Sequence, residues 1–324
     1  MSRPRNLQSF VVLRRTKKFA EGPQLRALYI LRGAATIVAL VLAPLLASAA
    51  TGRVECNSLP SRILAHPVPY CVLLPPSYDA EKTRRFPILY FFHGLGDDEQ
   101  MFVHTGGWNL VEDLWERKQL SEFLIVTPAA GATFYINSHD GKTRYEDFLI
   151  REFLPGIEKH FRVKPGRANR AVSGASMGGY GALHLAFRHP ELFSSVSAHS
   201  AALIEKLPAF LAGVAPNSGR GRVLGSTFGI PSDPAFWERN SPIVLARTAQ
   251  LGGMKIYFDC GDQDDFGFED GAKALDRVLT SRKIPHEFHL YPGRHDWQYF
   301  AAHLPESLQF HSRLFSSPAQ RKSK

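Results

Sequence analysis

Apolar, β-rich runs alternate with segments of helical spacing along most of this chain. The apolar runs cover residues 86–92, 123–127, 168–173, 193–198, 255–259 and 287–291, and residues 72–75 add an earlier edge strand. Between them, apolar residues recur at helical spacing over 110–118, 145–160, 178–188 and 271–282. Strands that alternate with helices pair mainly in parallel and are covered on both faces. The sequence therefore predicts a three-layer α/β fold with a mainly parallel central sheet.

Residues 203–250 break this alternation, because they are rich in Pro and Gly and contain no clear strand. They form a small insertion after the sixth strand, within a domain expected over residues 61–315. An insertion over the carboxyl ends of the strands would act as a lid where such sheets bind ligands. A solvated irregular connection is the alternative, and the sequence leaves both open.

Charge is concentrated at the two ends of the chain. The formal net charge of the 324 residues is +9, of which residues 1–50 carry +7 and the last four residues +3. Residues 51–320 are therefore close to neutral, at −1. A basic surface for nucleic acid is not expected on the body. Residues 316–324 are expected to form a basic disordered tail.

Residues 33–50 form an uncharged segment, GAATIVALVLAPLLASAA, that follows the basic residues and ends in small ones. A basic region, an apolar region and Ala47-Ser48-Ala49 together are typical of a secretory signal peptide, with cleavage after Ala49 or Ala50. The alternative is an uncleaved signal anchor, since about 18 residues is near the lower limit for one membrane span. In either case we expect the body to be exported, to the periplasm or the extracellular space, with membrane association only if the segment stays uncleaved.

An exported protein can form disulfides, which changes how its three cysteines are interpreted. Cys56 and Cys71 flank a short segment at the start of the mature chain, and we predict that they pair. Cys260 lies inside an apolar run and is expected to be a buried small hydrophobic residue. Residues 51–60 are expected to be a linker before the domain.

The sequence Gly174-Ala175-Ser176-Met177-Gly178 matches the pattern G-x-S-x-G. The pattern marks a strained turn from a strand to a helix, where glycine two residues on either side avoids collision with the serine. A β-type run precedes it and a helical run follows, as the motif requires. Ser176 is therefore the predicted nucleophile, and the Met177 N–H at the start of the helix is a predicted donor to an oxyanion.

His93-Gly94-Leu95-Gly96 follows the first long apolar run. In folds with the G-x-S-x-G turn, the loop after the third strand supplies the second oxyanion donor, and the Leu95 N–H is the candidate. Glycine lets this backbone approach a substrate, so His93 and Gly94 are candidate substrate contacts. A bracing role for His93 is favoured over a catalytic one.

The general base is expected among thirteen histidines. Only His295 follows a late strand and a tight turn, Tyr291-Pro292-Gly293-Arg294, which suits the chain order Ser, Asp, His.

The acid should lie between the strand at 255–259 and His295. Asp259 is still on the strand, whereas Asp264 lies on the loop after it and is the predicted acid, with Asp262 and Asp265 as competitors. The same loop matches a calcium loop poorly, and the sequence has no zinc-ligand spacing, so neither a metal nor another cofactor is predicted.

Four motifs in this order, HGLG, GASMGGYGAL, DCGDQD and YPGRHDW, resemble the esterase family of α/β-hydrolases. That family includes feruloyl and acetylxylan esterases, tributyrin-type esterases, S-formylglutathione hydrolases and secreted mycolyltransferases. The resemblance covers about residues 60 to 315 and implies an α/β-hydrolase fold. It also implies a catalytic triad of Ser176, Asp264 and His295, with Leu95 and Met177 forming the oxyanion hole.

Three functions remain open at this point. The first is a secreted serine esterase that hydrolyses small acyl or aryl esters, carbohydrate esters among them. The second is an acyltransferase that passes the acyl group to a sugar or lipid hydroxyl, and the third is a non-catalytic exported binding protein on the same scaffold. A small-molecule or carbohydrate ester is the expected partner, and Trp297, two residues after His295, is the aromatic residue expected near the site.

Overall fold

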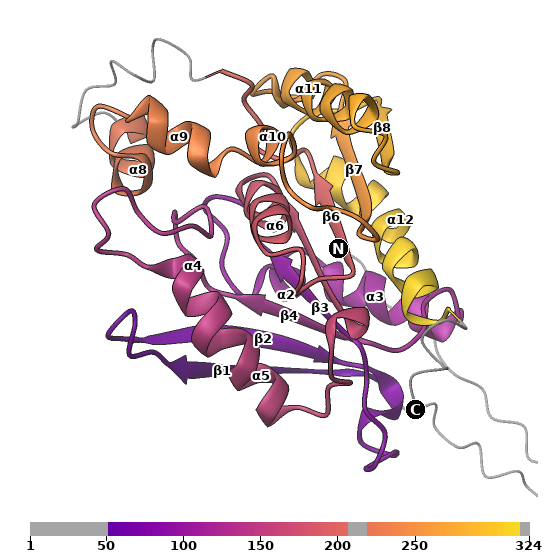
Figure 1. The fold of residues 1–324 in the computed structure, drawn as a ribbon. Helices are drawn as coiled ribbons and strands as arrows, with labels where there is room; N and C mark the ends of the chain where they lie inside the picture. The colour runs from indigo at the N-terminus through magenta and orange to yellow at the C-terminus, as the bar shows by residue number, and fades with distance from the viewer. Residues whose placement is uncertain (1–50, 207–218, 318–324) are drawn as a thin grey trace, which may run out of the picture. The chain divides into compact units, whose positions relative to one another are not determined.

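The structure is a computed structural model that describes residues 51–206 and 219–317, and these residues contain one eight-stranded sheet (Figure 1). Its order is β1-β2-β4-β3-β5-β6-β7-β8. The pairs β1–β2 and β2–β4 are antiparallel and the others are parallel. The strands are β1 (Arg53–Pro60), β2 (Pro67–Leu74), β3 (Ile88–Phe92), β4 (Leu124–Pro128), β5 (Arg170–Ala175), β6 (Ser195–His199), β7 (Lys255–Gly261) and β8 (Glu287–Tyr291).

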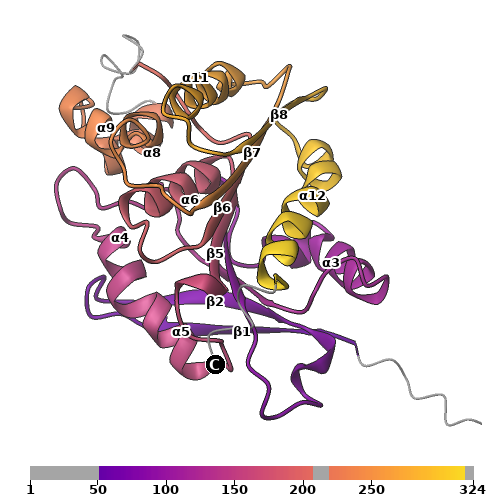
Figure 2. The ribbon, with the colours of Figure 1, turned by 45° about the vertical axis from the view of Figure 1, so that its right-hand side comes forward.

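Helices cover both faces of this sheet, as Figure 2 shows. Helices α3 and α12 lie on one face, whereas α4, α5, α6 and α11 lie on the other. The helices are α2 (Met101–His104), α3 (Gly107–Glu116), α4 (Tyr145–Phe148), α5 (Leu154–His160), α6 (Met177–Arg188), α8 (Gly219–Phe228), α9 (Pro234–Asn240), α10 (Pro242–Leu245), α11 (Phe268–Ser281) and α12 (Trp297–Phe315). A mainly parallel sheet between two helical layers confirms the predicted three-layer α/β fold.

The central strands are buried on both faces, which explains their continuous apolar runs. All five residues of β3 are buried. Tyr90 and Phe92 pack into the core beneath α5 and α6, while Leu89 and Phe91 pack into the core beneath α3 and α12. This alternation follows from the two-residue period of a strand. Strand β3 therefore stabilises both layers and fixes the loop that follows it.

Residues 53–60, expected to be a linker, instead form the edge strand β1. Each residue of β1 pairs with a residue of β2, and Cys56 lies opposite Cys71. The structure joins these two cysteines by a disulfide. Strand β1 is mostly exposed, with polar side chains at Glu55, Asn57 and Ser58. Its pairing with β2, and not an apolar pattern, makes it a strand.

The insertion at 203–250 is helical where the structure describes it, and it contributes α8, α9 and α10. Residues 207–218 of this insertion lie outside the described residues, so a lid stays a prediction. The expected signal segment at 1–50 and most of the expected tail, from residue 318 on, also lie outside them. In the ranges that are described, none of the helices has the length and apolar character needed to cross a membrane.

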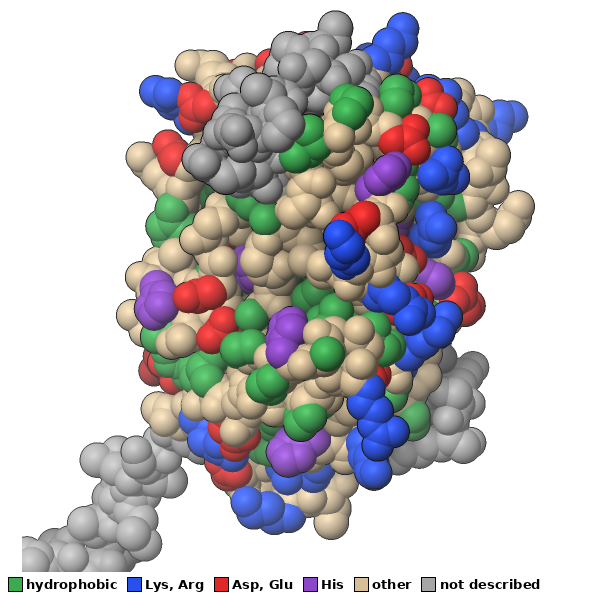
Figure 3. Space-filling view, turned by 90° about the vertical axis from the view of Figure 1, so that its left-hand side faces the viewer, with side chains coloured by type: hydrophobic (Ala, Val, Ile, Leu, Met, Phe, Trp, Pro, Cys, Tyr) green, Lys and Arg blue, Asp and Glu red, His purple; other side chains and the backbone are tan. Residues whose placement is uncertain are grey.

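Surface charge on the body is mixed in sign. On the face shown in Figure 3, Lys and Arg side chains are interspersed with Asp and Glu side chains. This mixture agrees with the formal charge near zero of residues 51–320.

Candidate active site

Ser176 occupies the sharp turn between β5 and α6. Its backbone has a φ of 55° and a ψ of −119°, a strained conformation for a residue with a side chain. A Cβ on Gly174 would collide with the backbone of Gly178, and a Cβ on Gly178 would collide with the carbonyl of Phe92. Both glycines are therefore required for the close packing of the turn, and the turn presents Ser176 at the carboxyl end of β5.

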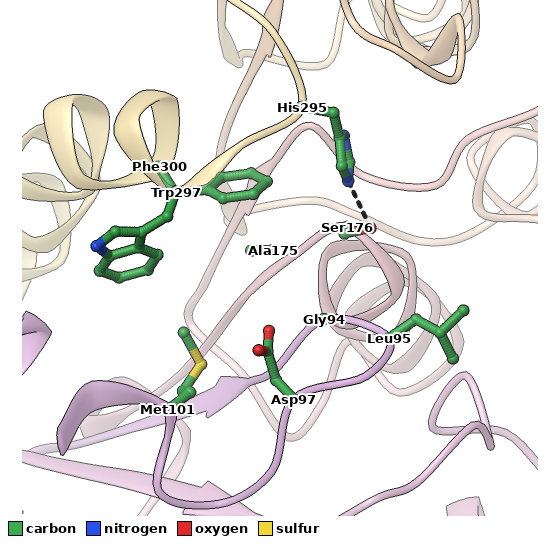
Figure 4. Close-up of a pocket in the computed structure, with 9 residues that line it drawn as sticks. All are labelled: Gly94, Leu95, Asp97, Met101, Ala175, Ser176, His295, Trp297 and Phe300. Carbon is green, nitrogen blue, oxygen red and sulfur yellow. Dashed lines mark hydrogen bonds between the residues drawn. The ribbon is translucent and has the colours of Figure 1, made fainter. Parts of the chain in front are cut away.

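His295 lies beside Ser176 on the loop between β8 and α12. Its Nε2 is 2.9 Å from Ser176 Oγ, and Figure 4 shows this hydrogen bond as a dashed line. Its Nδ1 is 2.7 Å from Oδ2 of Asp264, which follows β7. The structure thus brings together the three residues that the sequence placed in a triad, from three different loops. With Asp264 ionised, Nδ1–H donates to its carboxylate and Nε2 is left to accept from Ser176 Oγ–H.

Asp264 is held as an anion in a buried position. Its side chain has no exposed surface, and burial, the largest influence, raises its pKa. The hydrogen bonds from His295 and from the Phe266 N–H, 2.9 Å from Oδ1, more than offset burial, so the pKa of Asp264 lies below its ordinary value. Asp264 therefore remains charged at neutral pH and can stabilise a protonated imidazole.

The two competing carboxylates contact the backbone of the histidine loop and not the imidazole. Asp262 Oδ1 accepts from the Gly293 N–H at 3.1 Å. Asp265 Oδ2 accepts from the His295 N–H at 3.2 Å, and Oδ1 of the same residue pairs with Arg294. These contacts fix the position of the loop, whereas the imidazole contacts Asp264.

Three phenylalanine rings surround the imidazole of His295 edge-on. Their ring centroids lie 4.8 Å from it for Phe266, 5.4 Å for Phe268 and 5.3 Å for Phe300. The His295 side chain is only 8% exposed as a result. Limited access of water strengthens its two hydrogen bonds.

A second histidine and aspartate pair lies beneath the site and was not predicted from the sequence. His199 Nδ1 is 2.7 Å from Asp259 Oδ2, and both side chains are buried. The Tyr299 hydroxyl donates to Asp259 Oδ1 at 2.7 Å, and the Ser176 N–H donates to the His199 carbonyl at 2.9 Å. The pair therefore links the turn that carries Ser176 to the first turn of α12, next to the histidine loop.

The loop after β3 lies against Ser176. A Cβ on Gly94 would be 3.6 Å from Ser176 Cβ, so the glycine allows this close approach. The Leu95 N–H donates to no backbone group in the described part of the chain, and the Met177 N–H opens α6 without a partner inside the helix. Neither predicted oxyanion donor therefore gives its N–H to a backbone carbonyl of the described residues.

His93, a candidate substrate contact from the sequence, lies outside the pocket at Ser176. It has no exposed surface and does not line the pocket at Ser176. Its Nδ1 is 2.8 Å from the Gly94 carbonyl, and its Nε2 accepts from the Ala130 N–H at 3.0 Å. Burial lowers the pKa of His93, which keeps the ring neutral, as these two hydrogen bonds require. The histidine braces the loop because it is locked between two backbone groups.

A small pocket of about 120 Å³ opens at Ser176 (Figure 4). Trp297 lines it, as the sequence suggested, together with Phe300 on the same helix. Met101 and Asp97 line it as well, and no motif pointed to these two residues. The full lining is Gly94, Leu95, Asp97, Met101, Ala175, Ser176, His295, Trp297 and Phe300. A volume of this order suits a short acyl group or a single ring, since a cavity of about 150 Å³ in another protein accommodates benzene.

No group of three or more His, Cys, Asp or Glu residues in the described ranges could hold a metal ion. The groups that meet at Ser176 are a serine, a histidine, a carboxylate and backbone amides. Such a set can form and break an acyl-enzyme.

Comparison with known proteins matches this chain to a family. The sequence model of the family described as "Putative esterase" matches residues 61–311. An esterase of Mycobacterium tuberculosis is 32% identical over 245 residues, which cover 69% of this chain and 51% of that protein. The match therefore spans about half the length of that relative.

Two further comparisons cover more of the matched protein. A mycobacterial enzyme named diacylglycerol acyltransferase/mycolyltransferase, from Mycobacterium leprae, is 26% identical over 272 residues, which cover 74% of this chain and 80% of that enzyme. The structure of a ferulic acid esterase superposes with a TM-score of 0.70 at 29% identity, over 82% of this chain and 99% of that one.

Proposed function

This chain belongs to the esterase family of α/β-hydrolases, and from that premise we propose that it is a serine carboxylic-ester hydrolase with Ser176 as its nucleophile. The observation that carries the proposal is the unbroken chain of hydrogen bonds from Ser176 Oγ through His295 to Asp264. The strained turn at Ser176 supports it, since backbone strain of this kind is typical of functional sites.

In the proposed reaction, Ser176 Oγ attacks the ester carbonyl while His295 Nε2 takes the hydroxyl proton. The Leu95 and Met177 N–H groups stabilise the oxyanion of the tetrahedral intermediate. His295 then gives its proton to the leaving alcohol, and an acyl-enzyme remains. A water molecule, activated by the same histidine, attacks this acyl-enzyme, releases the acid and restores Ser176.

We infer that the substrates are small acyl or aryl esters, including esters of carbohydrates. The small pocket at Ser176 and its aromatic residues, Trp297 and Phe300, support this substrate class. The likeness to a ferulic acid esterase supports it as well. Rates on a series of p-nitrophenyl esters of increasing acyl length, with methyl ferulate and acetylated xylan beside them, test the inference. A rate that rises steadily beyond an octanoyl chain would contradict it.

We propose export as the location of this activity. The basic and apolar segment at the N-terminus supports export, and so does the Cys56–Cys71 disulfide, since disulfides persist mainly in oxidising compartments. Fractionation of producing cells, with the mass of the purified chain, tests the proposal. We expect enzyme outside the cytoplasm that begins at residue 50 or 51, and full-length cytoplasmic enzyme would contradict it.

Acyl transfer to a sugar or lipid hydroxyl is the second candidate function, favoured by the similarity to the mycobacterial acyltransferase. Both functions share the acyl-enzyme and differ only in the acceptor. Product analysis with and without a sugar acceptor separates them. Free acid as the main product in both conditions supports the hydrolase, whereas acylated sugar as the main product supports the transferase.

A further inference from the structure

Asp97 is the one acidic residue among the described residues that line the pocket at Ser176. It lies in the middle of the loop between β3 and α2 that also carries Leu95, and Gly96 turns the chain with a φ of 91°. Its side chain reaches into the pocket below Ser176, between Met101 and Leu95 (Figure 4). A carboxylate thus lies within a small pocket whose other side chains are mainly apolar.

The Asp97 carboxylate has no cationic partner among the described residues. No ion pair in the described ranges includes it, and a hydrogen bond from the backbone of Gly94 is among the influences that lower its pKa. The neighbouring Asp98 differs, because its carboxylate accepts from the Gln100 N–H at 2.9 Å and lies 3.9 Å from His104 Nδ1. Burial, the largest influence, raises the pKa of Asp97 and outweighs the lowering effects of His93 and of the hydrogen bond from the Gly94 backbone.

Gly94 lies between the Asp97 carboxylate and Ser176. A Cβ placed on Gly94 would lie 3.2 Å from Asp97 Oδ2 and 3.6 Å from Ser176 Cβ. The carboxylate therefore borders the same pocket as Ser176, where a substrate of this serine would lie. A carboxylate has about four lone-pair positions, so it can accept a further hydrogen bond from a substrate.

We propose that Asp97 determines substrate specificity: it accepts a hydrogen bond from a hydroxyl near the scissile ester and excludes esters that carry a carboxylate at that place. This inference rests on the proposed function, because it concerns the pocket of the proposed acyl-enzyme. Repulsion between two like charges about 6 Å apart in a partly buried site weakens binding by about ten- to a hundredfold. A hydrogen bond to a charged acceptor contributes a similar factor, about tenfold or more, in the opposite direction.

Two series of esters of matched size test the proposal, one for each side of the ester bond. On the acyl side, the substrates are methyl butyrate, methyl 3-hydroxypropionate and monomethyl malonate. On the alcohol side, they are propyl acetate, 2-hydroxyethyl acetate and O-acetylglycolate. In each series the end group changes from ethyl to hydroxymethyl to carboxylate, and kcat/KM is measured by pH-stat at pH 8. Ratios within a series cancel any general effect of a substitution on catalysis.

Asp97→Asn keeps the shape of the side chain and removes its charge. We expect it to raise kcat/KM for the anionic ester, relative to the alkyl ester, by at least about tenfold in one of the two series. Asp97→Ala removes the acceptor as well, and we expect it to lower the ratio for the hydroxylated ester by at least about threefold in the same series. Asp98→Asn removes a charge one residue away, outside the pocket lining, and is the control.

The outcomes separate this inference from the proposed function. Ratios in both Asp97 variants within twofold of wild type, in both series, would overturn the specificity role. An equal shift in Asp98→Asn would overturn it too, since general surface charge would then explain the effect. No turnover of any of the six esters by an enzyme whose Ser176 still reacts with a fluorophosphonate would overturn the substrate class alone. Turnover that persists in Ser176→Ala would instead refute the proposed function.

Discussion

Asp264→Asn is the perturbation that separates the proposed triad from its alternatives. The imidazolium that forms when His295 takes the serine proton lies beside a carboxylate oxygen 2.7 Å from Nδ1. With charge centres about 4 Å apart and an effective dielectric constant of about 20, this contact is worth about 4 kcal/mol, a factor of about 10³ in rate. An asparagine that donates to Nδ1 would also favour the wrong tautomer, which brings the expected loss toward 10⁴.

The assay is kcat/KM for p-nitrophenyl acetate at pH 8, with the urea midpoint of each variant as the check on folding. Asp262→Asn and Asp265→Asn are matched controls, because both carboxylates contact the histidine loop but not the imidazole. We expect each control to lose no more than about tenfold, the effect of a displaced loop. A loss below tenfold in Asp264→Asn, or a larger loss in either control, would refute the assignment of the acid.

Three further predictions concern stability and the nucleophile turn. Gly178→Ala forces a Cβ into the backbone of Phe92 and should lower kcat/KM by at least about 100-fold, because the nucleophile turn is displaced. Gly252→Ala is the control, since its Cβ would lie in open space and kcat/KM should stay unchanged. Equal activity of the two variants would contradict the packing requirement at the turn. Burial, followed by repulsion from a neighbouring histidine, lowers the pKa of His311 to about 3, so its ring is neutral in the fold but protonated in the unfolded chain below pH 6.5. Because of this lowered pKa, the free energy of unfolding falls as the pH drops from 7 to 5, and His311 contributes about 1 to 2 kcal/mol to that fall. Urea titrations of His311→Gln should show a smaller fall over the same pH range. An identical fall in the variant and the wild type would refute His311 as the cause. Reduction of the Cys56–Cys71 disulfide, which links residues 15 apart, should cost about 3 kcal/mol and lower Tm by about 10 °C in calorimetry, and an unchanged Tm would count against its stabilising role.

Two residues of the proposed triad could be picked out from the sequence because each lies beside a recognisable local pattern. Ser176 is marked by its two glycines, and His295 by the tight turn after a late strand. The choice among Asp262, Asp264 and Asp265 could not be made from spacing with the same force. All three carboxylates lie on one loop and all three hold the histidine loop, so only the positions of the atoms show which one contacts Nδ1.

The rest of the site depends on packing between distant segments. Asp97, Met101 and Phe300 meet in the pocket because α12 packs on the same face of the sheet as Leu89 and Phe91 of β3, which no local pattern encodes. The buried pair of His199 and Asp259 has the same origin, since it joins the ends of β6 and β7. Strand β1 escaped prediction for a different reason: an exposed edge strand carries polar side chains and lacks the apolar alternation of a half-buried strand.

The central claim is that Ser176 is a nucleophile activated by His295. A fluorophosphonate probe tests it most directly, because the probe reacts covalently with an activated serine and the modified peptide can be identified by mass spectrometry. We predict one adduct per chain, on Ser176, at a rate that falls at least about 10³-fold in His295→Ala, and no adduct in Ser176→Ala. Folded wild-type protein that remains unlabelled, or that carries the adduct on another residue, would contradict the account.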